Sequence, residues 1–532
     1  MADAPDQSRT IRDQHRAKKG PFMPPADPTQ PAQPGPRPNV VVFAVDQMGA
    51  ASLACNGNPD VETPNLDALA DAGHSFQRAY CNNPVCMPSR ATLITGRTPR
   101  QHGCISNGMV LDEQTTTMPG VLAESGYRTH AVGKLHHQPF GLPADVDAHS
   151  WESRAAWDSG EITGLPAGYY GYQTTDFVGG HGRGVFGDYA NWLDREHPGV
   201  RELYSPERAY AATGLGYRLE VPAGLHYNDW IASRACDFLS TVEDDEPFFL
   251  SCSFPDPHLP FAATRPYSER YDPASITLSP TWNDPADPVR WLARRRTEVA
   301  HFTQFDQAEL REIVAQTYGM ISHIDDCIGR VLHTLRQGGK YDNTIIVFLS
   351  DHGEYLGAHH LLSKSVWPYE DLLRVPFIWR TPHGTARGPD PAITSHLDLV
   401  PTILDYTGVG CDAFNNREGA RSDWPGLPGR SLRPHLEGTE TLPDQPALVE
   451  FDEDWTPGTM TRMRTVVSRR HKLVQYAGYT EGILFDLESD PNETTNLWND
   501  HDYAQVRSDL TTELVDQLAW SDPLPGPRIS GA

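Results

Sequence analysis

Runs of mainly apolar residues along the chain predict strands that are buried on both faces of a sheet. The clearest run is 39–45, Asn-Val-Val-Val-Phe-Ala-Val, and similar runs cover 128–132, 247–254, 344–349 and 375–379. Each is short and rich in β-branched or aromatic residues, so we expect strands rather than helices at these places.

Segments with apolar residues at helical spacing lie between these strands. Residues 63–73 open with Thr-Pro and close at a glycine, and 310–336 place six aliphatic residues at helical spacing. Helices are also expected at 226–242 and 398–406. This alternation predicts an α/β fold with a large mixed, mostly parallel sheet sandwiched by helices.

The pattern changes after about residue 410. A connector rich in glycine and proline, 411–445, leads to short alternating segments at 447–451, 464–468, 472–476 and 483–486. Alternation over so few residues is typical of half-buried antiparallel strands. We therefore expect a smaller C-terminal antiparallel α+β domain, packed on the larger one.

Three parts of the chain follow from these patterns. Residues 1–38, with eight prolines from Pro21 to Pro38, form an expected N-terminal arm, either a free tail or one lying on a neighbouring subunit. Residues 39–410 form the main domain and 411–532 the C-terminal subdomain. Within the main domain, 150–225 show no sustained periodicity, and we expect an irregular insertion that shapes a pocket.

Polar residues follow several of the predicted strands at the point where each ends. They are Asp46 and Gln47, Lys134 and His136, His258, and Asp351 and His352. The carboxyl ends of parallel strands meet at one edge of a sheet, so these side chains can share a pocket. Two carboxylates with an amide and an imidazole provide ligands for a divalent cation.

Residues 84–97, Pro-Val-Cys-Met-Pro-Ser-Arg-Ala-Thr-Leu-Ile-Thr-Gly-Arg, combine a thiol with a helix start. Pro88 suits the first turn of a helix, which places Cys86 at the helix N-terminus, where anions are favoured. Arg90, one turn further on, can reach the same anion with its guanidinium. The pattern predicts an anion site containing a modifiable side chain.

This stretch resembles the signature of type I sulfatases, which belong to the alkaline phosphatase superfamily. The matching residues are Cys86, Pro88, Ser89, Arg90, Thr95, Gly96 and Arg97. The segment 484–497 is similar to the closing segment of bacterial sulfatases, so the resemblance spans about residues 39–500. It implies an alkaline phosphatase-like fold and hydrolysis of a sulfate ester, with Cys86 oxidised to formylglycine by a formylglycine-generating enzyme.

The resemblance also implies roles for individual residues. The metal ligands would be Asp46, Gln47, Asp351, His352 and the modified Cys86. The residues that bind the sulfuryl group or move protons would be Arg90, Lys134, His136, His258 and Lys364. The nucleophile would be one hydroxyl of the hydrated aldehyde, and the second hydroxyl would later drive sulfate out. Six further histidines are interpreted as structural or rim residues: 102, 137, 323, 359, 360 and 396.

The expected ligand set is compatible with two metals and with two classes of ester substrate. Many sulfatases have Asp where Gln47 stands and Asn where His352 stands, and the combination found here also resembles phosphonate monoester hydrolases of the same superfamily. Ca²⁺ is favoured and Mn²⁺ is the alternative, because imidazole suits transition metals better. A phosphonate monoester or phosphodiester hydrolase using the same site is the alternative function. A non-catalytic relative is disfavoured, because the nucleophile and both metal carboxylates are present.

The charge and composition of the chain limit the kinds of molecule that it is expected to bind. The net charge of −26 argues against nucleic acid and anionic membranes, and it makes a small sulfated molecule an easier substrate than a polysulfated polymer. We see no membrane span and no secretory signal, and the eight cysteines form no disulfide pattern. A cytoplasmic enzyme is expected, with homo-oligomerisation left open.

Overall fold

The computed structural model describes residues 37–143, 148–285, 287–299, 302–410, 426–453 and 460–521. Nearly all of the expected N-terminal arm, 1–36, and much of the 411–445 connector lie outside these ranges. The division into three parts therefore stays a prediction. Within the described residues, no helix combines the length and apolar character needed to span a membrane.

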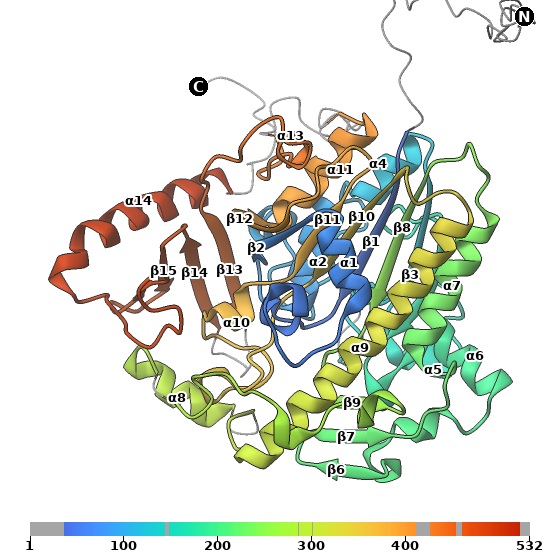
Figure 1. Ribbon diagram of the computed structural model, residues 1–532, viewed down its shortest axis with the longest axis horizontal. Coiled ribbons are helices and arrows are strands. Elements are labelled where there is room, and N and C mark those ends of the chain that lie inside the picture. Colours follow the sequence, from blue (N-terminus) through green and yellow to red (C-terminus); the bar gives the residue numbers. More distant parts are fainter. Residues whose placement is uncertain are drawn as a thin grey trace, which may run out of the picture. The chain divides into compact units, whose positions relative to one another are not determined.

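A nine-stranded sheet forms the centre of the described chain (Figure 1). Its strand order is β12-β2-β11-β10-β1-β8-β3-β4-β5, and only β11 and β5 run against the others. The strands are β1 (Asn39–Val45), β2 (His74–Tyr80), β3 (Arg128–Gly133), β4 (Thr174–Gly179), β5 (Phe186–Gly187), β8 (Phe248–Phe254), β10 (Thr344–Ser350), β11 (Phe377–Arg380) and β12 (Gly388–Ser395). The expected α/β class with a mixed, mostly parallel sheet is confirmed.

Helices cover both faces of this sheet. One face packs against α1 (Pro64–Asp71), α7 (Tyr227–Thr241) and α9 (Gln307–Gln337), and the other against α2 (Cys86–Thr95), α4 (Met118–Glu124) and α11 (Leu399–Thr407). The central strand β1 supplies alternate residues to the two cores, with Phe43 on the first and Val42 on the second. Both its faces are dry, which explains its unbroken apolar sequence.

Several elements differ from the sequence prediction. The 150–225 segment, expected to be irregular, contributes β4 and β5 to the main sheet as well as α5 (Arg154–Ser159) and α6 (Asp188–Glu196). Two strands near the other edge, β2 and β12, were not predicted. Their sequences, His-Ser-Phe-Gln-Arg-Ala-Tyr and Gly-Pro-Asp-Pro-Ala-Ile-Thr-Ser, mix polar residues and prolines with apolar ones, as strands near a sheet edge can.

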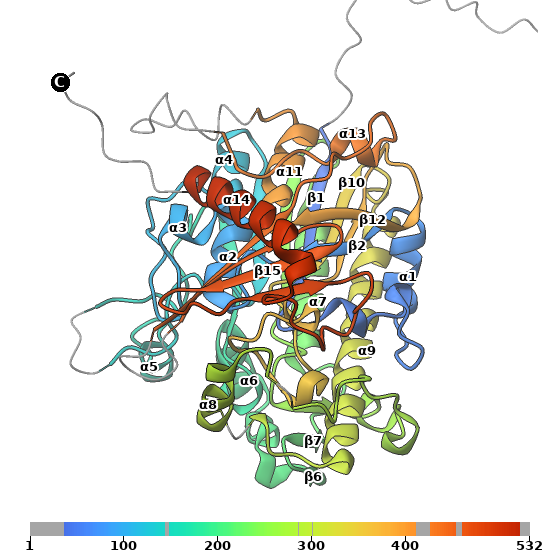
Figure 2. The ribbon, with the colours of Figure 1, turned by 90° about the vertical axis from the view of Figure 1, so that its left-hand side faces the viewer.

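Two smaller sheets complete the described chain. One has the order β6-β7-β9, from β6 (Ala211–Thr213), β7 (Gly216–Leu219) and β9 (Phe261–Thr264). The other is the predicted C-terminal antiparallel sheet of β13 (Ala447–Glu453), β14 (Thr461–Val467), β15 (His471–Tyr476) and β16 (Ile483–Asp486). Helix α14 (Ala504–Trp520) lies across this sheet (Figure 2) and packs Leu510 and Leu514 on it. Shorter helices are α3 (Pro99–His102), α8 (Arg290–Glu298), α10 (Glu370–Leu373) and α13 (Arg433–Leu436).

A buried ion cluster ties the C-terminal sheet to the main domain. Lys472 of β15 is fully buried, and its ammonium lies 3.0 Å from a carboxylate oxygen of Glu370 in α10 and also contacts Glu493. Tyr80 of β2 donates to the same Glu370. Both carboxylates contact this cation, so removing it weakens the compensation of buried charge in the cluster, in which Arg374 lies 3.6 Å from Glu370.

Lys472→Met is therefore expected to lower the free energy of unfolding by about 3–5 kcal/mol. Urea denaturation followed by circular dichroism measures this loss. Arg195→Met is the matched control, because the Arg195–Glu196 pair is exposed on both sides and such pairs contribute about 0–1 kcal/mol. Equal losses in the two variants would contradict the role assigned to Lys472.

Candidate active site

Five neighbouring parallel strands bring the candidate residues to one edge of the sheet. In the order β10, β1, β8, β3 and β4, their carboxyl ends are followed by Asp351 and His352, by Asp46 and Gln47, by His258, by Lys134 and His136, and by His181. Residues three hundred positions apart in the sequence thus meet because their strands are adjacent. The expectation that the strand-end residues share one site is met for Asp46, Gln47, Lys134, His258, Asp351 and His352.

Helix α2 brings its N-terminus to the same edge. It begins at Cys86, and every residue of the helix is buried. Arg90, one turn on, donates from Nε to Asp351 Oδ2 at 2.8 Å and from a terminal nitrogen to Asp46 Oδ2 at 3.3 Å. Its other terminal nitrogen bonds Ser253 Oγ and the Lys134 carbonyl, each at 3.0 Å. The guanidinium therefore fixes two carboxylates relative to the helix start.

Four side chains form a compact set of metal-binding atoms. Ligand atoms of Asp46, Cys86, Asp351 and His352 lie within 4.8 Å of one another, and all four residues are buried. His352 donates from Nδ1 to the Gly353 carbonyl at 2.9 Å, which leaves Nε2 facing the cluster, 3.2 Å from the Cys86 sulfur. A backbone partner of this kind sets the tautomer of a metal-binding histidine.

Gln47 completes the donor set from an unusual backbone position. Its φ of 64° is left-handed, and its backbone N–H donates to Asp351 Oδ1 at 3.0 Å. The side-chain nitrogen donates to Glu354, so the amide oxygen faces Lys364, 2.9 Å from its ammonium. Glu354 also accepts backbone N–H groups of residues 356 and 363 and is thereby held in place.

This donor set fits a divalent cation. Two carboxylates, one amide oxygen and one imidazole are suitable ligands for such an ion, and the sulfur position of Cys86 lies among them. The residues that would hold the ion are Asp46, Gln47, Asp351 and His352, with position 86. The structure therefore brings the predicted ligands together.

Two buried lysines belong to the site, Lys364 beside Cys86 and Lys134 beside Asp46. Lys364 Nζ is 3.1 Å from the Cys86 sulfur and 3.0 Å from His258 Nε2. Lys134 Nζ contacts Asp46 and donates to His181 Nε2 at 2.9 Å. Together with Arg90, these cations provide the positive charge that binding of a sulfate or phosphate group requires.

The charges shift the pKa values of the nucleophile position and its carboxylate. Burial alone would raise the pKa of Asp46, but the Lys134 ammonium and the Arg90 guanidinium hold it well below its usual range. Burial and the nearby Asp46 carboxylate raise the pKa of the Cys86 thiol. This raised pKa disfavours the thiolate form, which is the nucleophilic form of a cysteine.

The histidines of the site are neutral. Burial, the neighbouring imidazole of His181 and the Lys364 ammonium lower the pKa of His258 well below 6.5. Burial and Lys134 do the same to His136. His136 has a left-handed backbone conformation, with a φ of 59°, and its ring stacks on Phe140 at 3.9 Å between centroids.

Sequence reasoning missed two residues of this site, His181 and Glu354. His181 lies in the segment that was expected to be irregular, so the strand before it was not recognised, although Asp-Phe-Val-Gly directly precedes Gly-His there. Glu354 stands two residues after His352 in a polar loop, and sequence alone gives no sign that it binds Gln47. Ser89, by contrast, was noted as part of the motif, and its hydroxyl donates to the Asp351 carbonyl.

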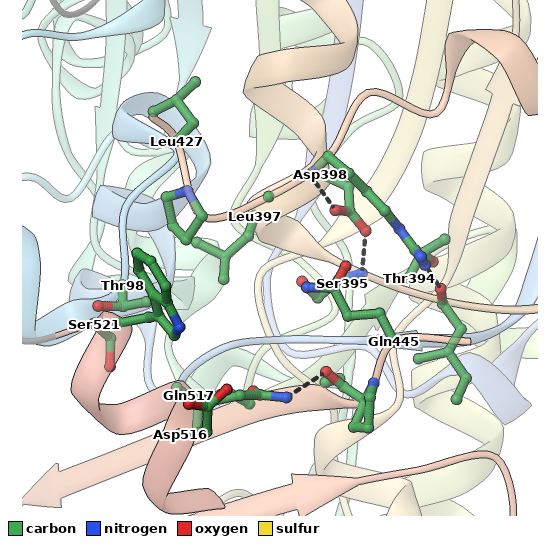
Figure 3. Close-up of a pocket in the computed structure, with 18 of the residues that line it drawn as sticks. Thr98, Thr394, Ser395, Leu397, Asp398, Leu427, Gln445, Asp516, Gln517 and Ser521 are labelled. Carbon is green, nitrogen blue, oxygen red and sulfur yellow. Dashed lines mark hydrogen bonds between the residues drawn. The ribbon is translucent and has the colours of Figure 1, made fainter. Parts of the chain in front are cut away.

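A second cavity, of about 480 Å³, lies apart from this edge (Figure 3). It is lined by residues of β12, of the 426–430 stretch and of α14, which contributes Gln517, and also by Thr98 and Asp398. Asp398 accepts backbone N–H groups of Ser395 and Arg430, and Gln517 donates to the Pro446 carbonyl. Its polar groups thus connect segments of the fold, and it contains none of the strand-end residues.

A cation site, buried cationic side chains and a modifiable residue at one sheet edge are features of metal-dependent ester hydrolases. Within that class, the chain belongs to the sulfatase family of the alkaline phosphatase superfamily, a family of sulfuric ester hydrolases. The family model described as Sulfatase matches residues 38–409, and the model described as N-sulphoglucosamine sulphohydrolase, C-terminal, matches 357–519.

Relatives and solved structures agree with this assignment. The chain is 28% identical over 507 residues to an arylsulfatase of Clostridium perfringens, with 91% of this chain and 94% of the relative covered. It is also 28% identical to the multifunctional alkaline phosphatase superfamily protein PehA of Trinickia caryophylli, covering 91% and 95%. The crystal structure of the phosphonate monoester hydrolase of Agrobacterium radiobacter aligns with a TM-score of 0.74 and 27% identity, covering 91% and 96%.

Proposed function

We propose that the protein hydrolyses a sulfate ester of a small organic molecule, using as nucleophile the hydrated aldehyde of a formylglycine made from Cys86. The observation that carries this proposal is the position of Cys86: it begins α2, within 3.2 Å of His352 Nε2 and 3.1 Å of Lys364 Nζ. Its own thiol, with a raised pKa, is poorly suited to attack. A formylglycine-generating enzyme is the partner that this maturation requires.

The buried cations bind and orient the reacting group. Lys134 and Lys364 neutralise sulfuryl oxygens from two sides, and Arg90 holds Asp46 and Asp351 in place behind them. A bound divalent cation would supply Lewis-acid stabilisation of negative charge at the same position. These groups are fixed before the substrate arrives, which is what makes such stabilisation effective.

Neutral imidazoles move the protons. His258 is neutral, with its proton on Nδ1 bonded to the Leu259 carbonyl, so the Lys364 ammonium first passes a proton to His258 Nε2, and Nε2 then gives this proton to the departing alcohol oxygen. His136, kept neutral by burial and by Lys134, accepts the proton of the second hydroxyl, so that the aldehyde re-forms and sulfate leaves. Its Nδ1 atom is buried and finds no hydrogen-bond partner among the described residues, so it is available for such a role.

The alternative is hydrolysis of phosphonate monoesters or phosphodiesters, which the likeness to a phosphonate monoester hydrolase favours. The two functions differ in how many charged oxygens the substrate presents. A sulfate monoester offers three non-bridging oxygens to the cations, whereas a phosphodiester replaces one by an ester group. A cationic donor left without its oxygen costs affinity in the transition state.

We expect kcat/KM for 4-nitrophenyl sulfate to exceed that for bis(4-nitrophenyl) phosphate by at least about tenfold, or about 1.4 kcal/mol. The two esters release the same alcohol, so the ratio reports the sulfuryl or phosphoryl centre alone. Initial rates with protein co-produced with a formylglycine-generating enzyme provide the measurement. A faster phosphodiester would establish the alternative function instead.

A further inference from the structure

The site contains an imidazole pair that the motifs did not predict. The rings of His181 and His258 stack with centroids 3.8 Å apart and planes only 14° from parallel. His181 comes from the end of β4, and His258 from the end of β8, two strands away in the sheet. Gly182, directly after His181, lies against Pro260, so the two loops also pack beside the stack.

Each imidazole of the pair is bonded to a different lysine. An ammonium group can only donate, so His181 Nε2 accepts from Lys134 at 2.9 Å and His258 Nε2 accepts from Lys364 at 3.0 Å. His258 Nδ1 in turn donates to the Leu259 carbonyl at 2.7 Å. The ring of His258 is thus held by a carbonyl, by a lysine and by the face of His181.

The pair also borders the solvent side of the site. Asp46, Cys86, Lys134, Asp351 and Lys364 are all buried, whereas His181 and His258 are partly exposed. If the sulfuryl group occupies the buried cluster, the alcohol half of the ester must point outward past these two rings. This step rests on the proposed function, because it assumes an ester whose charged end binds at Cys86.

We infer that His181 is a positioning residue of the hydrolysis, acting through two neighbours. Its ring holds His258 in the orientation from which the leaving oxygen is protonated. Its Nε2 atom holds the Lys134 ammonium beside Asp46, where that ammonium meets the sulfuryl group. The contact with His258 requires a flat ring, and the contact with Lys134 requires a hydrogen-bond acceptor. Single substitutions at His181 can therefore remove one contact and keep the other.

Two variants make this separation. His181→Phe keeps a flat ring against His258 but removes the acceptor for Lys134. His181→Gln keeps an acceptor oxygen but removes the ring. The measurement is kcat/KM for a series of sulfate esters whose alcohols range from good to poor leaving groups, with the slope against leaving-group pKa as the readout. His258→Ala provides the reference for complete loss of the acid.

His181→Phe is expected to lower kcat/KM by about tenfold for every ester and to leave the slope unchanged, because it removes one hydrogen bond to the charged Lys134 and keeps the ring against His258. His181→Gln is expected to slow esters of poor leaving groups about tenfold more than esters of good ones. The reason is that a less well oriented His258 would lose part of the roughly 10²–10⁴-fold effect of general acid catalysis. Its slope should therefore move toward that of His258→Ala.

His435→Gln is the matched control for the loss of a buried histidine. His435 bonds Asp390 at 2.7 Å, outside the site, so its variant should change thermal stability without changing the slope. Equal slopes for wild type, His181→Phe and His181→Gln would overturn the stacking role, and less than a twofold change in kcat/KM for His181→Phe would overturn the role toward Lys134.

The experiment on His181 can be interpreted even if the proposed function is wrong. If the wild-type enzyme prefers phosphodiesters, the same series is run with diesters, and the comparison of the two His181 variants keeps its meaning. If His258→Ala shows the wild-type slope, His258 is not the acid and the stacking role of His181 falls with it. The Lys134 role would still be read from His181→Phe alone.

Discussion

Cys86→Ala is expected to reduce turnover of sulfate esters by roughly 10⁵-fold or more, the scale on which loss of a catalytic nucleophile acts. The reason is chemical, because alanine offers no carbon that can be oxidised to the aldehyde. The fold should persist, since alanine is the best helix former and position 86 opens a helix. Initial rates and thermal melting of the same preparation measure the two quantities.

Two companion experiments sharpen this expectation. Peptide mass spectrometry of active protein should show residue 86 with its sulfur replaced by an aldehyde oxygen, and an unmodified thiol in fully active enzyme would refute the mechanism. Cys104→Ala is the matched control, because Cys104 is equally buried but lies outside the site, where its thiol donates to the Met109 carbonyl. Its variant should lose stability and keep its rate.

Cys86→Ser would test the role of the second hydroxyl. Serine can attack sulfur once, but it has no second hydroxyl whose deprotonation expels sulfate. The variant should therefore release about one equivalent of alcohol and then stop, with a sulfated enzyme visible by intact mass. Steady turnover by this variant would contradict the need for a hydrated aldehyde.

Asp351→Asn is expected to remove most of the bound metal and to lower kcat by about 10²–10⁴-fold, since a metal ion supplies several kcal/mol of transition-state stabilisation. Asp351 is fully buried and also accepts from Arg90, so its loss removes one of the two carboxylates that the cation and the guanidinium share, and Asp46 remains. Elemental analysis and rates before and after chelation provide the measurement. Activity that survives chelation would contradict the ligand assignment.

Asp390→Asn is the control for this experiment. Asp390 is also buried and accepts from two histidines, His74 and His435, at 2.9 and 2.7 Å, but it lies outside the strand-end site. Its variant should keep the metal content and the rate per folded molecule. The same elemental analysis distinguishes Ca²⁺, which prefers oxygen ligands, from Mn²⁺, which better accepts the imidazole of His352.

Some strands of this protein can be predicted from their own sequence, whereas others cannot. Strands such as β1 and β10 were predictable because both of their faces are buried, so nearly every residue must be apolar. Strands β2, β12 and β4 were missed because they lie toward the sheet edges, where packing demands are weaker and polar residues intrude. Because β4 was missed, His181, which follows this strand, was not recognised as part of the site.

Local chemistry in the sequence thus determined much of this protein: the buried strands, the helix that starts at Cys86, and the polar residues at the strand ends that form a cluster able to hold a metal ion. Only the tertiary structure decided which strand lies next to which. Strand order places β4 beside β3 and so brings His181 to Lys134 and His258. Pairing between distant strands depends on the packing of the whole sheet, and no short stretch of sequence encodes it.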